Sequence, residues 1–235
     1  MRNVVLKGNG IVLLIILVSF LRSPTVQATD IQVNEGQSIQ EAINQAQPGD
    51  IVTIQKGTYM ELLTIDKSIM LKGEEGAVID GAGEGNVITI TGDAVTIEGL
   101  TMQNSGSKQT DSGIYVQEGS NHVIKDNVFK DTMHGIYVYK SQDNVISGNQ
   151  ISSVSEHFSN RGSGIFILGG SGHTMEDNGM KRVQDGIYVE SASNVILRNN
   201  TALGSRYGLH LMFAKDVLAE ENYMASNITG MMVMD

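Results

Sequence analysis

Six short segments of this chain start with the same glycine and return at a nearly constant spacing. The glycines are Gly113, Gly135, Gly164, Gly186, Gly208 and Gly230. Mostly apolar residues follow each of them, and the successive gaps are 22, 29, 22, 22 and 22 residues. A period this strict is typical of a solenoid, in which each repeat forms one coil that is stacked on the next.

An asparagine recurs with the same period. It follows each of the first five glycines by 14 residues, at Asn127, Asn149, Asn178, Asn200 and Asn222. Equivalent residues of stacked coils should lie about 4.8 Å apart, the spacing of hydrogen-bonded strands. Asparagine tolerates the left-handed backbone of a tight turn and can bond to identical neighbours above and below. We therefore predict a structural role for this column.

Short apolar runs predict three strands in each coil. In the first strand, the residues one and three past the glycine are apolar in every repeat, so this face should point into the solenoid. The second strand centres on Val123 and Ile124 and their equivalents, and the third lies near Phe129. The expected fold is all-β: a parallel β-helix with about 22 residues per coil over residues 29–235.

The region before Gly113 is less regular. Ser38 and Glu41 form a capping-box pattern, and apolar residues at helical spacing predict a short helix over residues 38–47 that covers the first coil. Six strand-like runs follow between Ile51 and Ile97. We expect the regular coils to start at Gly113.

Residues 1–28 predict a secretory signal peptide. Arg2 and Lys7 precede an apolar run from Ile11 to Leu21, and small residues near Ala28 provide a cleavage site. The run is short for a membrane span, which needs about 20 residues; an uncleaved anchor is the alternative. We expect an exported protein, periplasmic or otherwise extracytoplasmic.

The charge balance narrows the classes of partner. Removing residues 1–28 leaves 13 of the 16 Lys and Arg residues and all 26 Asp and Glu residues. Such an acidic chain lacks the basic face that nucleic-acid binding requires. The chain also has no cysteine, so any metal site must use histidine, methionine, carboxylates or backbone.

The outward column of the first strand changes character along the stack. Two residues past each glycine lie Tyr115, Tyr137, Phe166, Tyr188, His210 and Met232. The position four past the glycine ends in Met212 and Met234. His210, Met212, Met232 and Met234 should therefore project together from neighbouring strands of one outer surface.

Imidazole and thioether ligands select copper, and Cu(I) above all, over hard ions. The column thus predicts a transient copper site. Two alternatives to metal binding stay open for these side chains. They would be buried under a segment that follows residue 235, or they would form an interface with a partner, for which methionine is well suited.

Further features carry weaker signals. The 29-residue gap places seven extra residues between Ser152 and Ser163, in a loop that holds His157, Phe158 and Arg161. This loop is either a contact segment or a neutral insertion. His122 and His173 share a column but are separated by Asn144, so they should not share an ion. His134 is expected in a turn.

The sequence resembles a known family. Ser38-Ile-Gln-Glu-Ala-Ile, Pro48-Gly-Asp-Ile-Val, Gly57-Thr-Tyr and Leu71-Lys-Gly resemble the pectate-lyase-like superfamily of right-handed parallel β-helices. Arg206-Tyr-Gly-Leu-His-Leu-Met212 and Gly230-Met-Met-Val-Met234 are similar to the NosD family, the accessory proteins of nitrous oxide reductase. The family motif covers His210, Met212 and Met234, whereas Met232 enters through the outward column.

This resemblance implies an extracytoplasmic scaffold without enzyme activity. It would be docked on a membrane ABC transporter of permease and ATPase subunits, and it would help to assemble the copper–sulfur cluster of nitrous oxide reductase with a copper chaperone as donor. Members of the family continue for more coils, so we expect this chain to be incomplete at its C-terminal end.

Two alternatives use the same fold. A non-catalytic carbohydrate-binding β-helix would use Tyr115, Tyr137, Phe166 and Tyr188 as a stacking platform. A polysaccharide lyase or hydrolase would need clustered carboxylates on an outer sheet. The outward columns of the first strand contain a single acid, Glu190, so catalysis is disfavoured.

Overall fold

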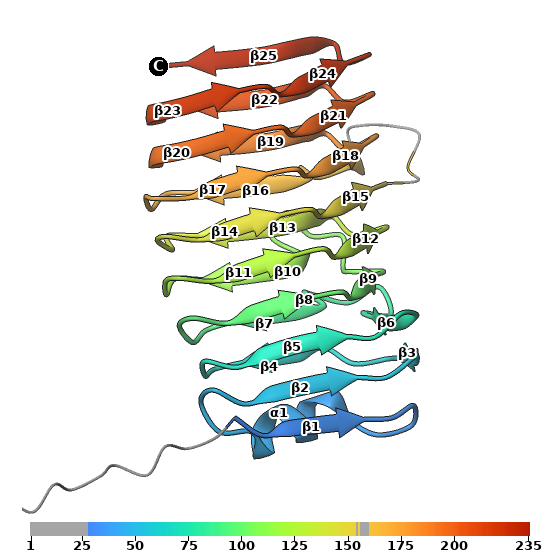
Figure 1. Cartoon of the computed structure of the whole chain (residues 1–235). Helices are drawn as coiled ribbons and strands as arrows, with labels where there is room; N and C mark the ends of the chain where they lie inside the picture. Colours follow the sequence, from blue (N-terminus) through green and yellow to red (C-terminus); the bar gives the residue numbers. More distant parts are fainter. Residues whose placement is uncertain (1–27, 154, 156–159) are drawn as a thin grey trace, which may run out of the picture.

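A computed structural model describes residues 28–153, 155 and 160–235. Its coils are stacked in one column, with the N-terminal coil at one end and the C-terminal coil at the other (Figure 1). The strands form three parallel sheets, which we number by the order of their strands within a coil. The predicted parallel β-helix is confirmed.

Sheet 1 contains the first strands of the coils; those of the later coils start near the repeat glycines. They are β4 (Leu63–Ile65), β7 (Ile88–Ile90), β10 (Ser112–Gln117), β13 (His134–Tyr139), β16 (Ile165–Leu168), β19 (Asp185–Glu190), β22 (Tyr207–Met212) and β25 (Thr229–Met234).

Sheet 2 contains the second strand of each coil. They are β1 (Asp30–Val33), β2 (Ile51–Ile54), β5 (Met70–Gly73), β8 (Thr96–Glu98), β11 (Val123–Lys125), β14 (Val145–Ser147), β17 (Thr174–Glu176), β20 (Ser193–Arg198) and β23 (Lys215–Glu220).

Sheet 3 completes each coil. Its strands are β3 (Gly57–Tyr59), β6 (Ala77–Asp80), β9 (Thr101–Gln103), β12 (Val128–Lys130), β15 (Gln150–Ser152), β18 (Gly179–Lys181), β21 (Thr201–Leu203) and β24 (Tyr223–Ala225).

The three sheets begin well before Gly113. Strand β4 already pairs with β7, and β7 pairs with β10 in the register that the later coils continue. Coils of 22 residues nevertheless start at Gly113, as expected: Leu63 pairs with Ile88 and Ile88 with Ile114, at separations of 25 and 26 residues, whereas Ile114 pairs with Ile136 at a separation of 22. The early coils keep the inward apolar positions, which the core requires, but lack the glycine and asparagine that mark the later repeats.

The lumen of the solenoid is filled by apolar side chains from all three sheets. Ile114, Ile136, Ile165, Ile187 and Leu209 form one fully buried column of sheet 1. Ile124 of sheet 2 and Phe129 of sheet 3 are also fully buried. The alternation of inward and outward residues therefore follows the prediction.

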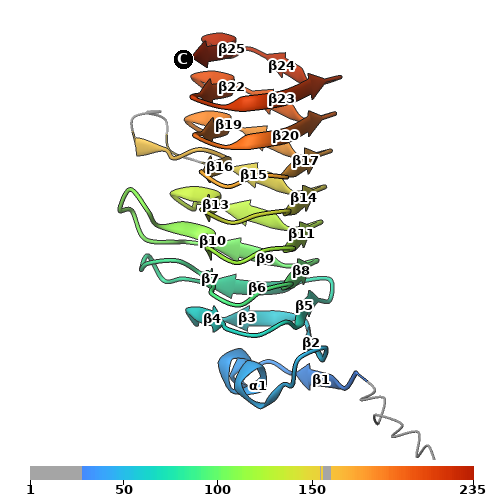
Figure 2. The same ribbon diagram turned by 90° about the vertical axis from the view of Figure 1, so that its left-hand side faces the viewer.

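The helix α1 (Ile39–Gln45) lies at the N-terminal end of the stack (Figure 2), where it contacts β1, β2 and β4. Ser38 Oγ accepts a hydrogen bond from the Glu41 backbone nitrogen at 3.2 Å, as the capping pattern predicts. The carboxylate of Glu61 supplies further caps, because it accepts from the backbone nitrogens of Ile39 and Gln40 at 3.0 and 3.1 Å. A residue from the first coil thus fixes the helix on the stack.

The repeat glycines are explained by close packing. A Cβ added at Gly186 would lie 2.5 Å from the Ala202 Cβ, and closer still to the Gly208 carbonyl oxygen of the next coil. The glycines of the other complete coils face the inward side chain of sheet 3 in the same way; at Gly113 this side chain is Phe129. Glycine lets sheet 1 approach sheet 3 at the corner where they meet.

Two sequence predictions fall partly outside the described residues. These are residues 1–27 of the predicted signal peptide, and His157 and Phe158 of the predicted loop. Arg161 of that loop is described and buried, and its Nε donates to the Ser155 carbonyl oxygen at 2.6 Å. None of the helices in the described part of the chain is long and apolar enough to span a membrane.

Candidate functional site

The outer face of sheet 1 brings together the four side chains that the sequence singled out. Strand β22 pairs with β25 so that His210 lies beside Met232, and Met212 lies beside Met234. The neighbouring residues Leu209 and Leu211 point into the lumen and are buried. The predicted adjacency is confirmed, while metal binding stays a prediction.

His210 is less accessible than we expected for a residue on the outer surface. Only 6 % of it is exposed, although it points away from the lumen. The ring of Tyr188 stacks on it with centroids 4.2 Å apart and an interplanar angle of 8°, and Tyr207 packs edge-on at 5.1 Å. Met212 and Met232 are half-buried, and Met234 is 38 % exposed.

A buried carboxylate holds the inner edge of this site. Asp185 accepts hydrogen bonds from Arg206 Nε at 2.9 Å and Arg206 Nη2 at 2.7 Å. Its Oδ2 also lies 3.0 Å from His210 Nδ1. Side-chain hydrogen bonding to Asp185 raises the pKa of Arg206. Because Asp185 is fully buried, this network is screened little by solvent.

The sequence analysis did not single out this network. The structure places Asp185 in β19, paired in register with Tyr207 of the next coil, beside Arg206. The 22-residue period could have revealed this pairing. Asp185 directly precedes the repeat glycine Gly186, and Tyr207 directly precedes the repeat glycine Gly208, so the two residues occupy equivalent positions of neighbouring coils.

The second ring nitrogen of His210, Nε2, is buried. Among the described residues, none offers a hydrogen bond to the buried Nε2 atom. Most buried polar atoms in folded proteins are paired, so a buried nitrogen that is not paired needs a physical reason. The Nε2 atoms of the buried His122 and His173 are likewise unpaired among the described residues, so the open nitrogen of His210 points to a ligand only together with the thioethers beside it.

The Tyr188 hydroxyl organises the other edge of the site. It donates to the Glu190 carboxylate at 2.7 Å and lies 3.4 Å from the sulfur of Met212. Burial, followed by the hydrogen bond to Glu190, raises the pKa of Tyr188. The Tyr188 hydroxyl therefore stays protonated and donates its hydrogen bond to the Glu190 carboxylate.

The aromatic column does not form an open platform for a sugar. Tyr137 and Phe166 stack with centroids 4.8 Å apart, and Phe166 and Tyr188 stack at 4.6 Å with an interplanar angle of 1°. Sugars stack on exposed ring faces, and these faces cover one another. The geometry thus disfavours the carbohydrate-binding alternative.

A polysaccharide lyase that uses Ca²⁺ would need clustered carboxylates on one face. The described residues contain no cluster of three or more His, Asp or Glu side chains that could hold a metal ion. On the face around His210, Asp185 is bound by Arg206, and Glu190 accepts from Tyr188.

The remaining described histidines have structural surroundings. His122 and His173 are fully buried, and Asn144 lies between them: its side-chain oxygen accepts from the His122 backbone nitrogen, and its side-chain nitrogen lies 3.3 Å from His173 Nδ1. His134 belongs to β13 rather than to a turn, and its Nδ1 accepts from the Ser163 backbone nitrogen at 3.0 Å. Burial lowers the pKa of all three imidazoles.

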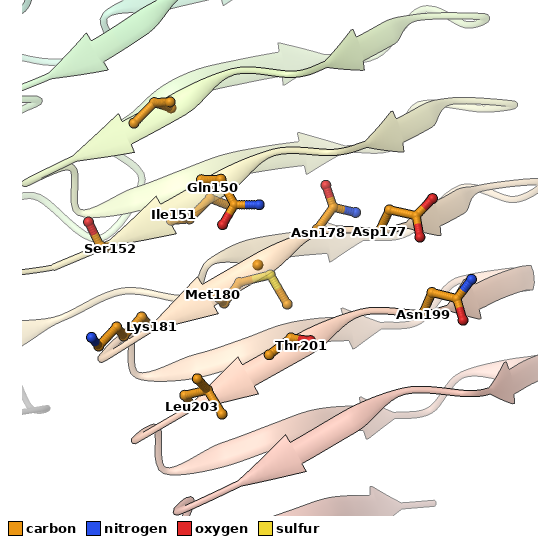
Figure 3. Close-up of a pocket in the computed structure, with 12 residues that line it drawn as sticks. Gln150, Ile151, Ser152, Asp177, Asn178, Met180, Lys181, Asn199, Thr201 and Leu203 are labelled. Carbon is orange, nitrogen blue, oxygen red and sulfur yellow. The ribbon is translucent and has the colours of Figure 1, made fainter.

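A shallow cleft of about 470 Å³ lies elsewhere, on sheet 3 (Figure 3). Gly179 opens it because this position of β18 has no side chain, whereas β15 carries Gln150 and β21 carries Thr201. Asp177 and Lys181 lie toward opposite ends of the cleft and are exposed. The cleft contains none of the side chains that the sequence predicted to be functional.

The face around His210 fits a soft metal ion better than a hard one. It offers an imidazole nitrogen and the thioethers of Met212, Met232 and Met234, while its two carboxylates are engaged by protein groups. Thioether and imidazole donors suit Cu(I), whereas free carboxylate oxygens suit Mg²⁺ or Ca²⁺. The donor set is therefore consistent with copper as cargo.

The fold and its repeats define the class of protein. The family described as "Right handed beta helix region" matches residues 85–235. This match covers more than half of the chain, so the chain belongs to that family.

More specific likeness points to one kind of β-helix protein. A protein of Pseudomonas aeruginosa named "Probable ABC transporter binding protein NosD" is 27% identical over 134 residues, 55% of this chain and 31% of that protein. The protein of the same name from Stutzerimonas stutzeri is 30% identical over 134 residues, with the same coverage. The chain thus spans about a third of the length of these relatives.

Solved structures with the same fold include polysaccharide-degrading enzymes. An alginate lyase from a Paenibacillus species has a TM-score of 0.72 at 17% identity, over 85% of this chain and 77% of the lyase. The family 28 exopolygalacturonase of Yersinia enterocolitica has a TM-score of 0.67 at 12% identity, over 88% and 60% of the two chains. At such identities the likeness shows the fold alone.

Proposed function

We propose that this chain is an exported accessory scaffold for maturation of the copper centre of nitrous oxide reductase. It works with a membrane ABC transporter and receives copper from a copper chaperone, and it is not itself an enzyme. The names of the two relatives support the association with an ABC transporter. The similarity of residues 206–234 to the NosD family supports the link to nitrous oxide reductase.

One observation carries the proposal. The buried Nε2 of His210 has no partner among the described residues, and Met212 and Met232 lie next to His210 on the same face. An imidazole and neutral thioethers, without a thiolate, make a site that binds Cu(I) but releases it readily. Such a site suits a protein that passes copper between partners.

A Cu(I) titration against a competing chelator tests this proposal. We expect the full chain to bind Cu(I), and the double variant His210→Ala, Met212→Ala to bind it at least tenfold more weakly. Met60→Ala is the matched control, because Met60 is 72 % exposed in the loop between β3 and β4, far along the stack. Equal affinity in the double variant would remove the copper site.

Two further arms test the partners and the remaining alternative. The full chain should copurify with the permease and ATPase of the ABC transporter when they are produced together, and failure would contradict the docking role. In a glycan-binding assay we expect no retention, because the aromatic faces are covered. Retention that is lost in Tyr115→Ala would favour the carbohydrate-binding alternative instead.

A further inference from the structure

We infer that Asp185 is a positioning residue for copper binding: it fixes the His210 ring with its proton on Nδ1 and its lone pair on Nε2. This inference rests on the proposed function and specifies how its site is built. Neither Asp185 nor its bond to His210 follows from the sequence motif around His210.

The first step is the direction of the hydrogen bond between Asp185 and His210. A carboxylate held by both Nε and Nη2 of a guanidinium, at 2.9 and 2.7 Å, acts as an acceptor. The contact of 3.0 Å between Asp185 Oδ2 and His210 Nδ1 therefore requires Nδ1 to donate. In the neutral ring, the lone pair must then lie on Nε2.

The second step is the rigidity of the ring. Tyr188 covers one face of His210 in a nearly parallel stack, and Tyr207 packs against its edge. The hydrogen bond to Asp185 restricts rotation of the His210 ring about its bond to Cβ. Carboxylates orient metal-binding histidines in this manner in many metal sites.

The third step is the selectivity for the ion. Asp185 is occupied by Arg206 and His210, and Glu190 by the Tyr188 hydroxyl. The donors left on this face are the Nε2 lone pair, the thioethers of the neighbouring methionines and one oxygen of Glu190. Such a set favours Cu(I) over Zn²⁺, because Zn²⁺ prefers thiolate, several imidazoles or free carboxylates.

The variant Asp185→Asn tests the positioning role. The amide can donate to Nδ1, which would shift the proton of the neutral ring to Nε2 and block ligation. The full chain, selectively labelled with ¹⁵N-histidine and free of metal, is measured by NMR at alkaline pH. We expect His210 to carry its proton on Nδ1 in the wild type and on Nε2 in Asp185→Asn.

Cu(I) affinity is measured on the same samples. We expect Asp185→Asn to weaken it by about 10- to 100-fold, the usual effect of losing such an outer partner. The matched control is Glu220→Gln, which removes the carboxylate of a similar arginine pair on sheet 2. This control should change neither the His210 proton position nor the Cu(I) affinity.

Two results would overturn the inference. The first is a wild-type His210 that carries its proton on Nε2, which needs no variant to fold. The second is unchanged Cu(I) affinity in folded Asp185→Asn when His210→Ala does lose affinity, and this outcome leaves the proposed function standing. If His210→Ala binds Cu(I) as tightly as the wild type, the copper site and the role of Asp185 both fail.

Discussion

The side chains of Asn149 and Asn178 are joined across two coils by a shared acceptor. Asn178 Oδ1 accepts from the Asn149 backbone nitrogen at 3.1 Å and from Asn149 Nδ2 at 3.0 Å. The Asn178 amide in turn donates to the Ile146 carbonyl oxygen at 2.9 Å. Each buried asparagine therefore satisfies backbone groups of the preceding coil and so ties two coils together.

We predict that Asn178→Ala lowers the free energy of unfolding by about 2–4 kcal/mol. The change leaves the Asn149 donors and the Ile146 carbonyl without partners in a buried site, and each such loss costs about 1 kcal/mol or more. Urea unfolding followed by circular dichroism measures the difference.

Asn222→Ala is the matched control for the ladder. Asn222 makes the equivalent bonds to Asn200 and Leu197 but is half-buried, so water can replace part of them. We expect a loss of about 1 kcal/mol. Equal losses at Asn178 and Asn222 would contradict the view that burial gives the ladder its strength.

A second prediction concerns the repeat glycines. Gly186→Ala should lower the free energy of unfolding by about 1–3 kcal/mol, because the new methyl group would collide with Ala202 and with the Gly208 carbonyl. At Gly230 the nearest atom would be the Met224 Cβ at 3.9 Å, which is an ordinary contact.

Gly230→Ala should therefore change stability by less than about 1 kcal/mol. Thermal and urea unfolding of the two variants, side by side with the wild type, give the comparison. A large loss in Gly230→Ala would show that backbone freedom, rather than close packing, explains this column.

Much of the fold follows from the period because the interior of a β-helix repeats the same packing problem in every coil. The inward columns and the neighbours of His210 could be read directly from it. The backbone at the asparagine corner could not. The left-handed residue is the one before the asparagine, as at Asp126 before Asn127 and Asp177 before Asn178. A turn signal places the corner but does not resolve its individual dihedral angles.

The period also predicted part of the candidate site, namely which residues lie side by side on neighbouring strands. Register predicts which residues are adjacent, and it placed His210 next to Met232. It does not predict which polar side chains become buried. Asp185 and Arg206 lie 21 residues apart, and their pairing depends on side-chain reach across one coil rather than on the column itself.

A third prediction concerns pH. Burial lowers the pKa of His122 and His173 below the usual 6.5, so the unfolded chain binds more protons than the folded one as the pH falls. Stability from these groups is fully present above about pH 6.5 and declines as acid is added toward their folded-state pKa values. Urea midpoints measured between about pH 5 and 8 should show this decline.

His173→Asn separates this effect from the titration of carboxylates. Asparagine already occupies the same column at Asn144, so the change suits the site. We expect His173→Asn to reduce the slope of the unfolding free energy against pH by up to about 1.4 kcal/mol per pH unit, which is the contribution of one proton. An unchanged slope would mean that His173 does not stay neutral in the folded chain.

The last prediction compares two arginine–carboxylate pairs that differ in burial. Asp185 is buried and its partner Arg206 is 33% exposed, whereas Arg198 and Glu220 are 40% and 42% exposed. Asp185→Asn should lower the free energy of unfolding by about 1–3 kcal/mol, since charge-assisted bonds in a buried site are lost. Glu220→Gln should change it by less than about 1 kcal/mol, because water screens this pair.

Urea unfolding at low and high salt distinguishes the two cases. Salt should shrink the small effect of Glu220→Gln further, and it should leave that of Asp185→Asn nearly unchanged because ions cannot reach the buried carboxylate. Similar losses and similar salt dependence in both variants would mean that Asp185 is solvated, and the fixed geometry of His210 would then lack its support.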